Sequence, residues 1–289
     1  MRTTLKLTAA VAAAAALTLG LSACSAPSDT SASSTKKGKD ADPAAKLLIA
    51  ASPTPHSVIL EYVRDHLAKD AGLKLEVKQY NDYNVPNTAT QSGEVDGNFF
   101  QHKPYLDEFN KKNKTDIVPV VNVEIEPLGL YSKKVKKVSE LGEGATIAVP
   151  NDVTNEGRAL KLLADNKVIE LKDGVGAGAT LKDIKDDKGI KFTEIEAAQI
   201  PARLADVDAA VINGNFAIGA KLNPAKDSLA LEKAEGNPYA NFLAVKKGNE
   251  QDPRIVKLAK LLNSDEVKKF IEDKFSNGAV IPAFGPAKG

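Results

Sequence analysis

KLLIAASPTPHSVILEYVRDHLAKDAGLKLEVKQY, residues 46–80, predicts a strand, a helix and a second strand in succession. Residues 46–52 form a short apolar run. Residues 57–72 then carry apolar side chains at helical spacing, and Gly72 is placed to end the helix. Residues 73–80 alternate apolar and charged side chains, as a half-buried strand does. This succession is typical of α/β proteins.

The same alternation continues along the chain. Strands are predicted at residues 96–100 and 116–125, with a helix between them at residues 103–113. Further elements follow in the middle of the chain: a strand at 145–150, a helix at 151–166, a strand at 190–197, a helix at 200–207 and a strand at 208–214. The predicted fold class is therefore α/β.

Two short phrases occur twice. EVDGNFF (94–100) and DVDAAVI (206–212) share a turn followed by a strand, and LGLYSKKV (128–135) resembles NFLAVKKG (241–248). The second pair brackets the middle block, so we infer that the chain leaves one α/β lobe, builds a second and returns. The predicted domains, with a cleft between them, are a first lobe of residues 47–133 plus 238–289 and a second lobe of residues 134–237.

The N-terminal residues have the pattern of a secretion signal. Residues 1–23 combine a charged start with an apolar run that is shorter than the roughly 20 residues of a membrane-spanning helix. The run ends in LSAC, which resembles a bacterial lipobox and implies lipid attachment at Cys24; an ordinary signal peptide with an incidental cysteine is the alternative. Residues 24–46 have no apolar period and are predicted to be a flexible tether, with the folded body starting near Leu47.

Composition argues against several classes of protein. The 39 basic and 38 acidic side chains include no long basic block, so nucleic acid is not an expected partner. With three histidines and one cysteine expected to carry lipid, the chain offers no thiol–imidazole pair, and HExxH, GxSxG and GxxxxGK[ST] are absent from the sequence. The glycines of residues 173–180 lack dinucleotide-binding spacing. We therefore expect that the protein is not an enzyme and that it binds no cofactor.

Ligands of α/β proteins bind beyond the carboxyl ends of strands, near helix N-termini. After the strand predicted at 145–150, Asn155 and Arg158 share one face of a helix, and a guanidinium beside free backbone N–H groups suits a carboxylate. An exposed arginine on an amphipathic helix is the alternative. Asn213 and Asn215 follow a later strand and can bind an ammonium and a carboxylate, although Asn-Gly-Asn also suits a plain turn.

Aromatic side chains cluster in NFFQHKPYL, residues 98–106, in a chain with few aromatics. Phe100 and His102 lie two apart in an extended segment and therefore on one side, where their rings suit an apolar or thioether group. The alternative places Phe99 and Tyr105 in the core and has His102 cap the next helix. We expect Phe99 in the core, and Phe100 and His102 in the cleft.

These residues belong to motifs that resemble a known family, the methionine-binding lipoproteins of bacterial ABC importers. The resemblance runs from about Leu47 to the C-terminus, and its motifs occur in the same order: SPTPH, NFFQHKPYLDEF, EIEPLGLYS, PNDVTNEGRAL, EAAQIPARLADVDAAVINGNFA and NPYANFLAVKK. It implies a two-lobed periplasmic-binding-protein-like fold of type II that closes on L-methionine, possibly D-methionine. It also implies delivery to a membrane permease driven by an ATPase, from a lipid anchor on the extracytoplasmic face.

The resemblance also implies roles for single residues. Carried over by motif, Arg158 holds the ligand carboxylate, and Asn155 and Asn213 hold its polar end, with Asn215 a weaker candidate. The residues implied to surround the thioether are Tyr83, Phe100 and His102. The phrase around Tyr83, NDYNVPN, matches the family except that Asn81 replaces the usual threonine, which leaves the ligand open.

Several alternatives remain at this point. Another amino acid or a methionine-containing dipeptide could be the ligand. A metal receptor would use His56, His102 and carboxylates, because zinc needs three or four converging ligands. From a different class, a lipid-anchored surface adhesin or a cryptic hydrolase would bind a host protein or turn over esters or peptides.

Overall fold

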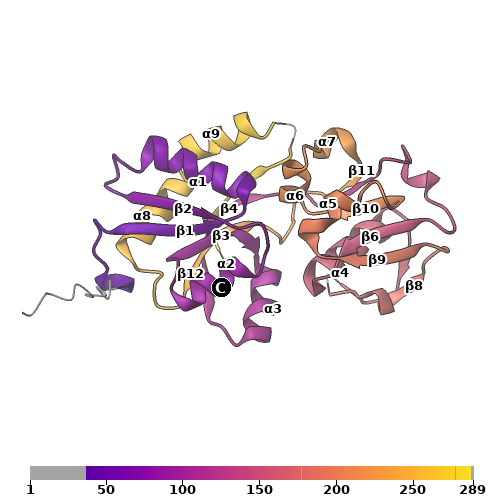
Figure 1. Ribbon diagram of the computed structural model, residues 1–289, viewed down its shortest axis with the longest axis horizontal. Helices are drawn as coiled ribbons and strands as arrows, with labels where there is room; N and C mark the ends of the chain where they lie inside the picture. The colour runs from indigo at the N-terminus through magenta and orange to yellow at the C-terminus, as the bar shows by residue number, and fades with distance from the viewer. Residues whose placement is uncertain (1–36, 177, 277, 288–289) are drawn as a thin grey trace, which may run out of the picture. The chain divides into compact units, whose positions relative to one another are not determined.

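The computed structural model describes residues 37–176, 178–276 and 278–287 (Figure 1). The predicted signal peptide, Cys24 and most of the predicted tether lie outside the described residues. Within the described part of the chain, no helix has the length and apolar character needed to cross a membrane.

The first lobe is built on a six-stranded sheet with the order β13-β4-β12-β3-β1-β2. Its strands are β1 (Lys46–Ala51), β2 (Lys74–Gln79), β3 (Gly97–His102), β4 (Ile117–Ile125), β12 (Asn241–Lys246) and β13 (Ile281–Pro286). Its helices are α1 (Val58–Tyr62), α2 (Val85–Ser92), α3 (Lys103–Asn113), α8 (Pro253–Leu262) and α9 (Asp265–Lys274). Pairing is parallel from β3 through β1 to β2 and antiparallel around β12.

Helices cover both faces of this sheet, which explains the apolar runs of its central strands. Alternate side chains of β1 point to opposite faces: Leu47 and Ile49 join the core formed with α1, α8 and α9, whereas Ala50 packs in the cluster of α2. Figure 1 shows α1 and α9 along one side of the sheet and α3 along the other. Phe99 is fully buried in the first of these cores, as the sequence predicts.

The second lobe is built on a five-stranded sheet with the order β11-β5-β10-β6-β9. Its strands are β5 (Gly129–Tyr131), β6 (Thr146–Pro150), β9 (Lys191–Ile195), β10 (Ala209–Ile212) and β11 (Ser228–Leu231). Its helices are α4 (Val153–Asp165), α5 (Ile200–Arg203), α6 (Gly214–Gly219) and α7 (Pro224–Asp227), and β7 (Glu170–Leu171) pairs with β8 (Ile184–Asp186) in a small separate sheet. One face packs against α4 and the other against α5 and α6.

The two sheets share a topology. The order β12-β3-β1-β2 corresponds to β5-β10-β6-β9, and in both sets one antiparallel pair is followed by two parallel pairs. The phrases that occur twice in the sequence lie in equivalent strands, β3 with β10 and β5 with β12. Because β5 pairs within the second sheet, we propose that the chain first crosses between lobes near residues 126–128, not after residue 133.

Two predicted helices differ in extent. The helical segment predicted at 57–72 begins after Thr54, whose backbone is extended, and ends at Leu67, with wider π-type turns on both sides of α1. The helix predicted at 200–207 ends at Arg203 and continues as a turn.

The last part of the predicted tether contacts the body. Lys37 Nζ donates to the carbonyl of Gly93 at 2.9 Å and pairs with Asp96 at 3.4 Å, and Ala41 is buried. These contacts use a backbone carbonyl and one ion pair, so they leave no apolar period in the sequence. The described body therefore begins before Leu47.

Candidate ligand-binding cleft

A small pocket lies between the lobes. Every residue predicted to bind ligand lines it: Tyr83, Phe100, His102, Asn155, Arg158, Asn213 and Asn215. The other lining residues are Gln101, Tyr105, Glu126, Gly214 and Asn241. The structure therefore brings the predicted set together.

Equivalent strand ends supply most of these side chains. Phe100 and His102 lie at the end of β3, and Asn213 follows β10, the equivalent strand of the second lobe. Asn155 and Arg158 lie in the first turns of α4, directly after β6. This arrangement follows the rule that the carboxyl ends of strands form the site in α/β sheets.

His102 both caps a helix and lines the cleft. Its Nδ1 accepts a hydrogen bond from the Tyr105 backbone N–H at 3.2 Å, which caps α3, so the ring proton is on Nε2. Nε2 lies 3.1 Å from Asn155 Oδ1 and donates to it across the two lobes. Burial and the nearby positive charge of Arg158 lower the pKa of His102 to about 3, which keeps the imidazole neutral. The two roles considered for His102 from the sequence, capping the next helix and lining the cleft, therefore both occur in the structure.

The Asn155 amide is fully occupied by protein groups. Its Oδ1 accepts hydrogen bonds from His102 and, at 3.0 Å, from Asn213 Nδ2, while its Nδ2 donates to both carboxylate oxygens of Asp152 at 3.0 Å. Asp152 in turn caps α4 by accepting from the Asn155 backbone N–H. Asn155 is thus placed to orient its two neighbours rather than to bind a ligand through its own amide.

The Asn213 amide is only half occupied. Its Nδ2 donates to Asn155, but Oδ1 is buried and has no hydrogen-bond partner among the described residues. Asn213 is 5% exposed and lines the pocket. A buried acceptor without a donor is costly, so this oxygen suits a ligand group that carries N–H donors.

Arg158, on the same helix as Asn155, is also buried and lines the pocket. Nε and Nη2 donate to the Glu232 carboxylate, and Nη2 also donates to the Glu126 carbonyl at 3.0 Å. The guanidinium lies 4.1 Å from the centre of the Tyr239 ring, within the range of a cation–π contact. Nη1 makes no hydrogen bond with the described residues, so a planar, charged donor remains for a carboxylate in the pocket.

Aromatic rings form the apolar wall. The Tyr83 ring lies 5.9 Å from that of Phe100 and 4.9 Å from that of Phe216 in the second lobe. The Tyr83 hydroxyl donates to Asn215 Oδ1 at 2.6 Å, which links the lobes directly. With the bond from His102 to Asn155, this contact holds the cleft closed.

The sequence analysis missed several lining or supporting residues. Glu126 and Tyr239 lie in the segments that connect the lobes, where no periodic pattern marks a buried side chain. Glu232 follows β11 and reaches Arg158 from 74 positions away. The one available signal was Glu126 in EIEPLGLYS, a carboxylate beside proline directly after an apolar strand.

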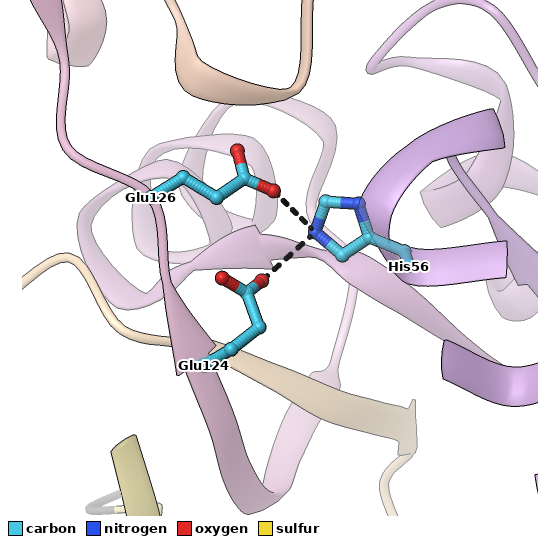
Figure 2. A group of neighbouring side chains, drawn as sticks. All are labelled: His56, Glu124 and Glu126. Atoms are coloured by element: carbon cyan, nitrogen blue, oxygen red, sulfur yellow. Dashed lines mark ion pairs between the residues drawn. The ribbon is translucent and has the colours of Figure 1, made fainter. Parts of the chain in front are cut away.

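The metal-receptor alternative is not supported in its original form. In the described residues, metal-ligating atoms converge at His56, Glu124 and Glu126, whereas His102 is not part of this group. Burial raises the pKa of both glutamates to about 8, and the negative charge of Glu124 adds to the shift of Glu126. This cluster, shown in Figure 2, adjoins the pocket through Glu126.

Two α/β lobes of shared topology that close on a small polar pocket define the class of two-lobed substrate-binding proteins. The sequence profile of the NlpA lipoproteins matches residues 47–284, so the chain belongs to the NlpA lipoprotein family. The resemblance and the α/β fold expected from the sequence are both confirmed.

Named relatives agree with this assignment. The chain is 42% identical over 244 residues to the methionine-binding lipoprotein MetQ of Bacillus subtilis, covering 82% of this chain and 88% of the relative. It is 41% identical over 222 residues to the D-methionine-binding lipoprotein MetQ of Escherichia coli, covering 75% and 82%. A nutrient-binding protein of Burkholderia cenocepacia, solved bound to methionine, is 43% identical with a TM-score of 0.79, covering 82% of this chain and 100% of that one.

Proposed function

We propose that the chain is the substrate-binding lipoprotein of an ABC importer and binds methionine in the cleft between its lobes. One observation carries this proposal: a buried guanidinium shares a pocket and an aromatic wall with a buried amide oxygen that has no partner among the described residues. A free amino acid has the matching carboxylate, ammonium and side chain. The names of the relatives support methionine as that amino acid.

The roles of the pocket residues follow from their free atoms. Arg158 binds the carboxylate through the guanidinium edge that Glu232 leaves open, and Asn213 Oδ1 accepts from the ammonium. Tyr83, Phe100 and His102 surround the thioether, where flat, polarizable rings make favourable contacts with sulfur. Asn155 orients His102 and Asn213, and Asn215 holds Tyr83 in the closed cleft.

The remaining parts of the proposal concern the membrane. A signal peptide is removed, lipid on Cys24 anchors the chain to the extracytoplasmic face, and the closed, loaded protein docks on a permease with its ATPase. The chain itself performs no catalysis, since the importer needs the ligand delivered unchanged. Detergent-phase partition of the protein made by a lipidating host tests the anchor. The wild type is expected in the detergent phase, and Cys24→Ala is expected in the aqueous phase.

Calorimetry with a matched set of ligands tests the binding site. The full-length protein, purified in detergent, is unfolded and refolded to remove carried ligand and is then titrated with L-methionine and D-methionine. Methioninol lacks the carboxylate and 4-(methylthio)butanoate lacks the ammonium, and each is expected to bind at least about a hundredfold more weakly, because it leaves a buried polar group unpaired. Failure of both methionine enantiomers to bind correctly refolded protein would remove methionine as the ligand.

Dipeptides and other amino acids are the second arm of the same experiment. A methionine-containing dipeptide has its carboxylate and ammonium farther apart than methionine does. It therefore cannot reach Arg158 and Asn213 in the same way, and we expect weaker binding. Tighter binding of a dipeptide or of another amino acid would keep the receptor role but change its ligand.

A further inference from the structure

The cluster of His56, Glu124 and Glu126 lies beside the methionine pocket but is not explained by it. Figure 2 shows both carboxylates pointing to the same imidazole nitrogen. His56 Nε2 lies 3.3 Å from Glu124 Oε1 and 3.4 Å from Glu126 Oε1. One potential ligand atom from each residue lies within 4.8 Å of the other two.

Among the described residues, the side chains of this cluster have fewer hydrogen-bond partners than buried polar groups normally have. His56 is 1% exposed, Glu124 is 0% exposed and Glu126 is 6% exposed. Both Glu124 oxygens and Glu126 Oε1 have no hydrogen-bond partner in the described part of the chain. The His56 ring lies near the Asn241 side chain and the Thr54 backbone, but neither contact has the geometry of a well-formed hydrogen bond. A single Nε2–H points in one direction and cannot align with two carboxylates on different sides, so a proton on the ring does not satisfy the group.

We propose that His56, Glu124 and Glu126 form a site for a divalent transition-metal cation, zinc being the best match, that is separate from the transported ligand. Imidazole nitrogen and carboxylate oxygen are both ligands that zinc takes in proteins. Donor atoms about 2.0–2.2 Å from a tetrahedral zinc lie about 3.3–3.5 Å apart, which is the spacing of His56 Nε2 from both oxygens.

Charge and coordination agree with this assignment. Two ionised carboxylates and a neutral imidazole balance the two positive charges of a divalent cation. The occupied site therefore has no net charge. Three protein ligands leave a fourth position for water, as in zinc sites that remain partly open. The Asn215 backbone N–H donates to Glu126 Oε2 at 2.7 Å and orients that carboxylate, leaving Oε1 toward His56.

The position of the site gives it a structural role in the cleft. Glu124 lies next to the last residue of β4 in the first lobe, while Glu126 directly follows β4 and contacts the second lobe through Asn215. The approach is close, because a Cβ on Gly214 would lie only 2.5 Å from Glu126 Cβ. A bound cation would therefore fix the crossing segment relative to the first lobe, and Glu126, which lines the pocket, marks the route of entry.

Metal analysis of the full-length protein tests the proposal. The protein is purified through a tag without histidines, dialysed against metal-free buffer and analysed by plasma mass spectrometry. We expect about one zinc per chain, retained in His66→Gln and His102→Gln and lost in His56→Gln and Glu124→Gln. His66 is exposed and His102 lies in the pocket, so the chain's other two histidines serve as matched controls.

A second measurement guards against variants that simply fold poorly. The wild-type protein is stripped with a chelator, and its melting temperature is measured before and after zinc is added back. Zinc is expected to raise the melting temperature in the wild type and not in Glu124→Gln, since binding to the native state alone stabilises it. Cobalt(II) in place of zinc should give the visible absorption of a tetrahedral site.

The metal measurements decide whether the cation site exists. Methionine is titrated into the same samples, so a failure of the metal site is distinguished from a failure of methionine binding. Retention of stoichiometric zinc, or of another divalent transition metal, that depends on His56 and Glu124 supports the site. Metal-free protein whose melting temperature and calorimetric heat do not respond to zinc, cobalt, nickel or manganese overturns it, and the cluster then holds a shared proton instead.

Discussion

The equivalent strands β3 and β10 end at the same place in their lobes but present different chemistry to the pocket. In the first lobe, β3 brings Phe100 and His102, and the neighbouring loop adds Tyr83. In the second lobe, Asn213 follows β10 and Arg158 follows β6. One topology therefore supplies an apolar, aromatic half-site and a polar, charged half-site.

Neither half-site is complete without the other. The His102 imidazole donates to Asn155 and the Tyr83 hydroxyl donates to Asn215, so each of these rings donates a hydrogen bond to the opposite lobe. A ligand that fills the pocket completes both sets of contacts only when the lobes are together. The division between the lobes predicts how substitutions should differ in size.

The largest loss is expected for Arg158→Ala in the polar half-site. Removing the guanidinium leaves the ligand carboxylate and Glu232 without their cation, and breaking a buried charge pair is strongly destabilising. We expect methionine affinity to fall at least about a hundredfold, or about 2.7 kcal/mol, by calorimetry. Lys161→Ala, an exposed position on the same helix, should leave the affinity unchanged. Equal affinities for Arg158→Ala and the wild type would rule out the carboxylate role.

A smaller loss is expected for Asn213→Ala. This change removes the unpartnered acceptor proposed for the ammonium and one of the two donors to Asn155 Oδ1. The affinity for methionine should fall at least about tenfold, or about 1.4 kcal/mol, while the affinity for 4-(methylthio)butanoate should change little. If both ligands weaken equally, Asn213 acts on the shape of the pocket and not on the ammonium.

Substitution in the aromatic half-site should change selectivity more than anchoring. Phe100→Leu keeps an apolar side chain but removes the ring beside the thioether. We expect methionine to bind about three- to tenfold more weakly, corresponding to about 0.7–1.4 kcal/mol, and alanine, which lacks the thioether, to be affected much less. An equal loss for both amino acids would remove the distinction between the half-sites.

Much of this site could be predicted from the sequence because its residues follow strand ends. Apolar runs locate β3, β6 and β10, and the polar or aromatic residues just beyond them must meet at the carboxyl edge of the sheets. Phe100, His102, Arg158 and Asn213 lie in such positions. Their family motifs then add the ligand, which strand position alone does not specify.

Other parts depend on contacts between distant segments and have no local pattern. The pairing of Arg158 with Glu232 and the packing of Tyr239 arise only when the chain returns to the first lobe. The sequence also could not reveal that the Asn155 side chain forms hydrogen bonds with His102, Asn213 and Asp152. These partners come together only in the folded protein. A direct contact of Asn155 with the ligand stays a prediction.

The smallest expected effect is a pH dependence of the protein's free energy of unfolding, caused by His102 in the aromatic half-site. The imidazole titrates at 6.5 when unfolded, whereas burial and Arg158 lower its folded pKa to about 3. Below pH 6.5 the unfolded chain therefore binds a proton that the folded chain excludes, and the free energy of unfolding falls as the pH falls.

Between pH 7 and pH 6 this one group should remove about 0.7 kcal/mol of stability, because over that interval the unfolded state holds on average about half a proton more than the folded state. The contribution is isolated by measuring urea unfolding of the wild type and His102→Gln at both pH values and comparing the two changes. His66→Gln is the control, since it removes an exposed histidine of the same lobe. A wild type whose pH dependence equals that of His102→Gln would mean that the imidazole titrates in the cleft as it does in the unfolded chain, so that its folded pKa is not lowered.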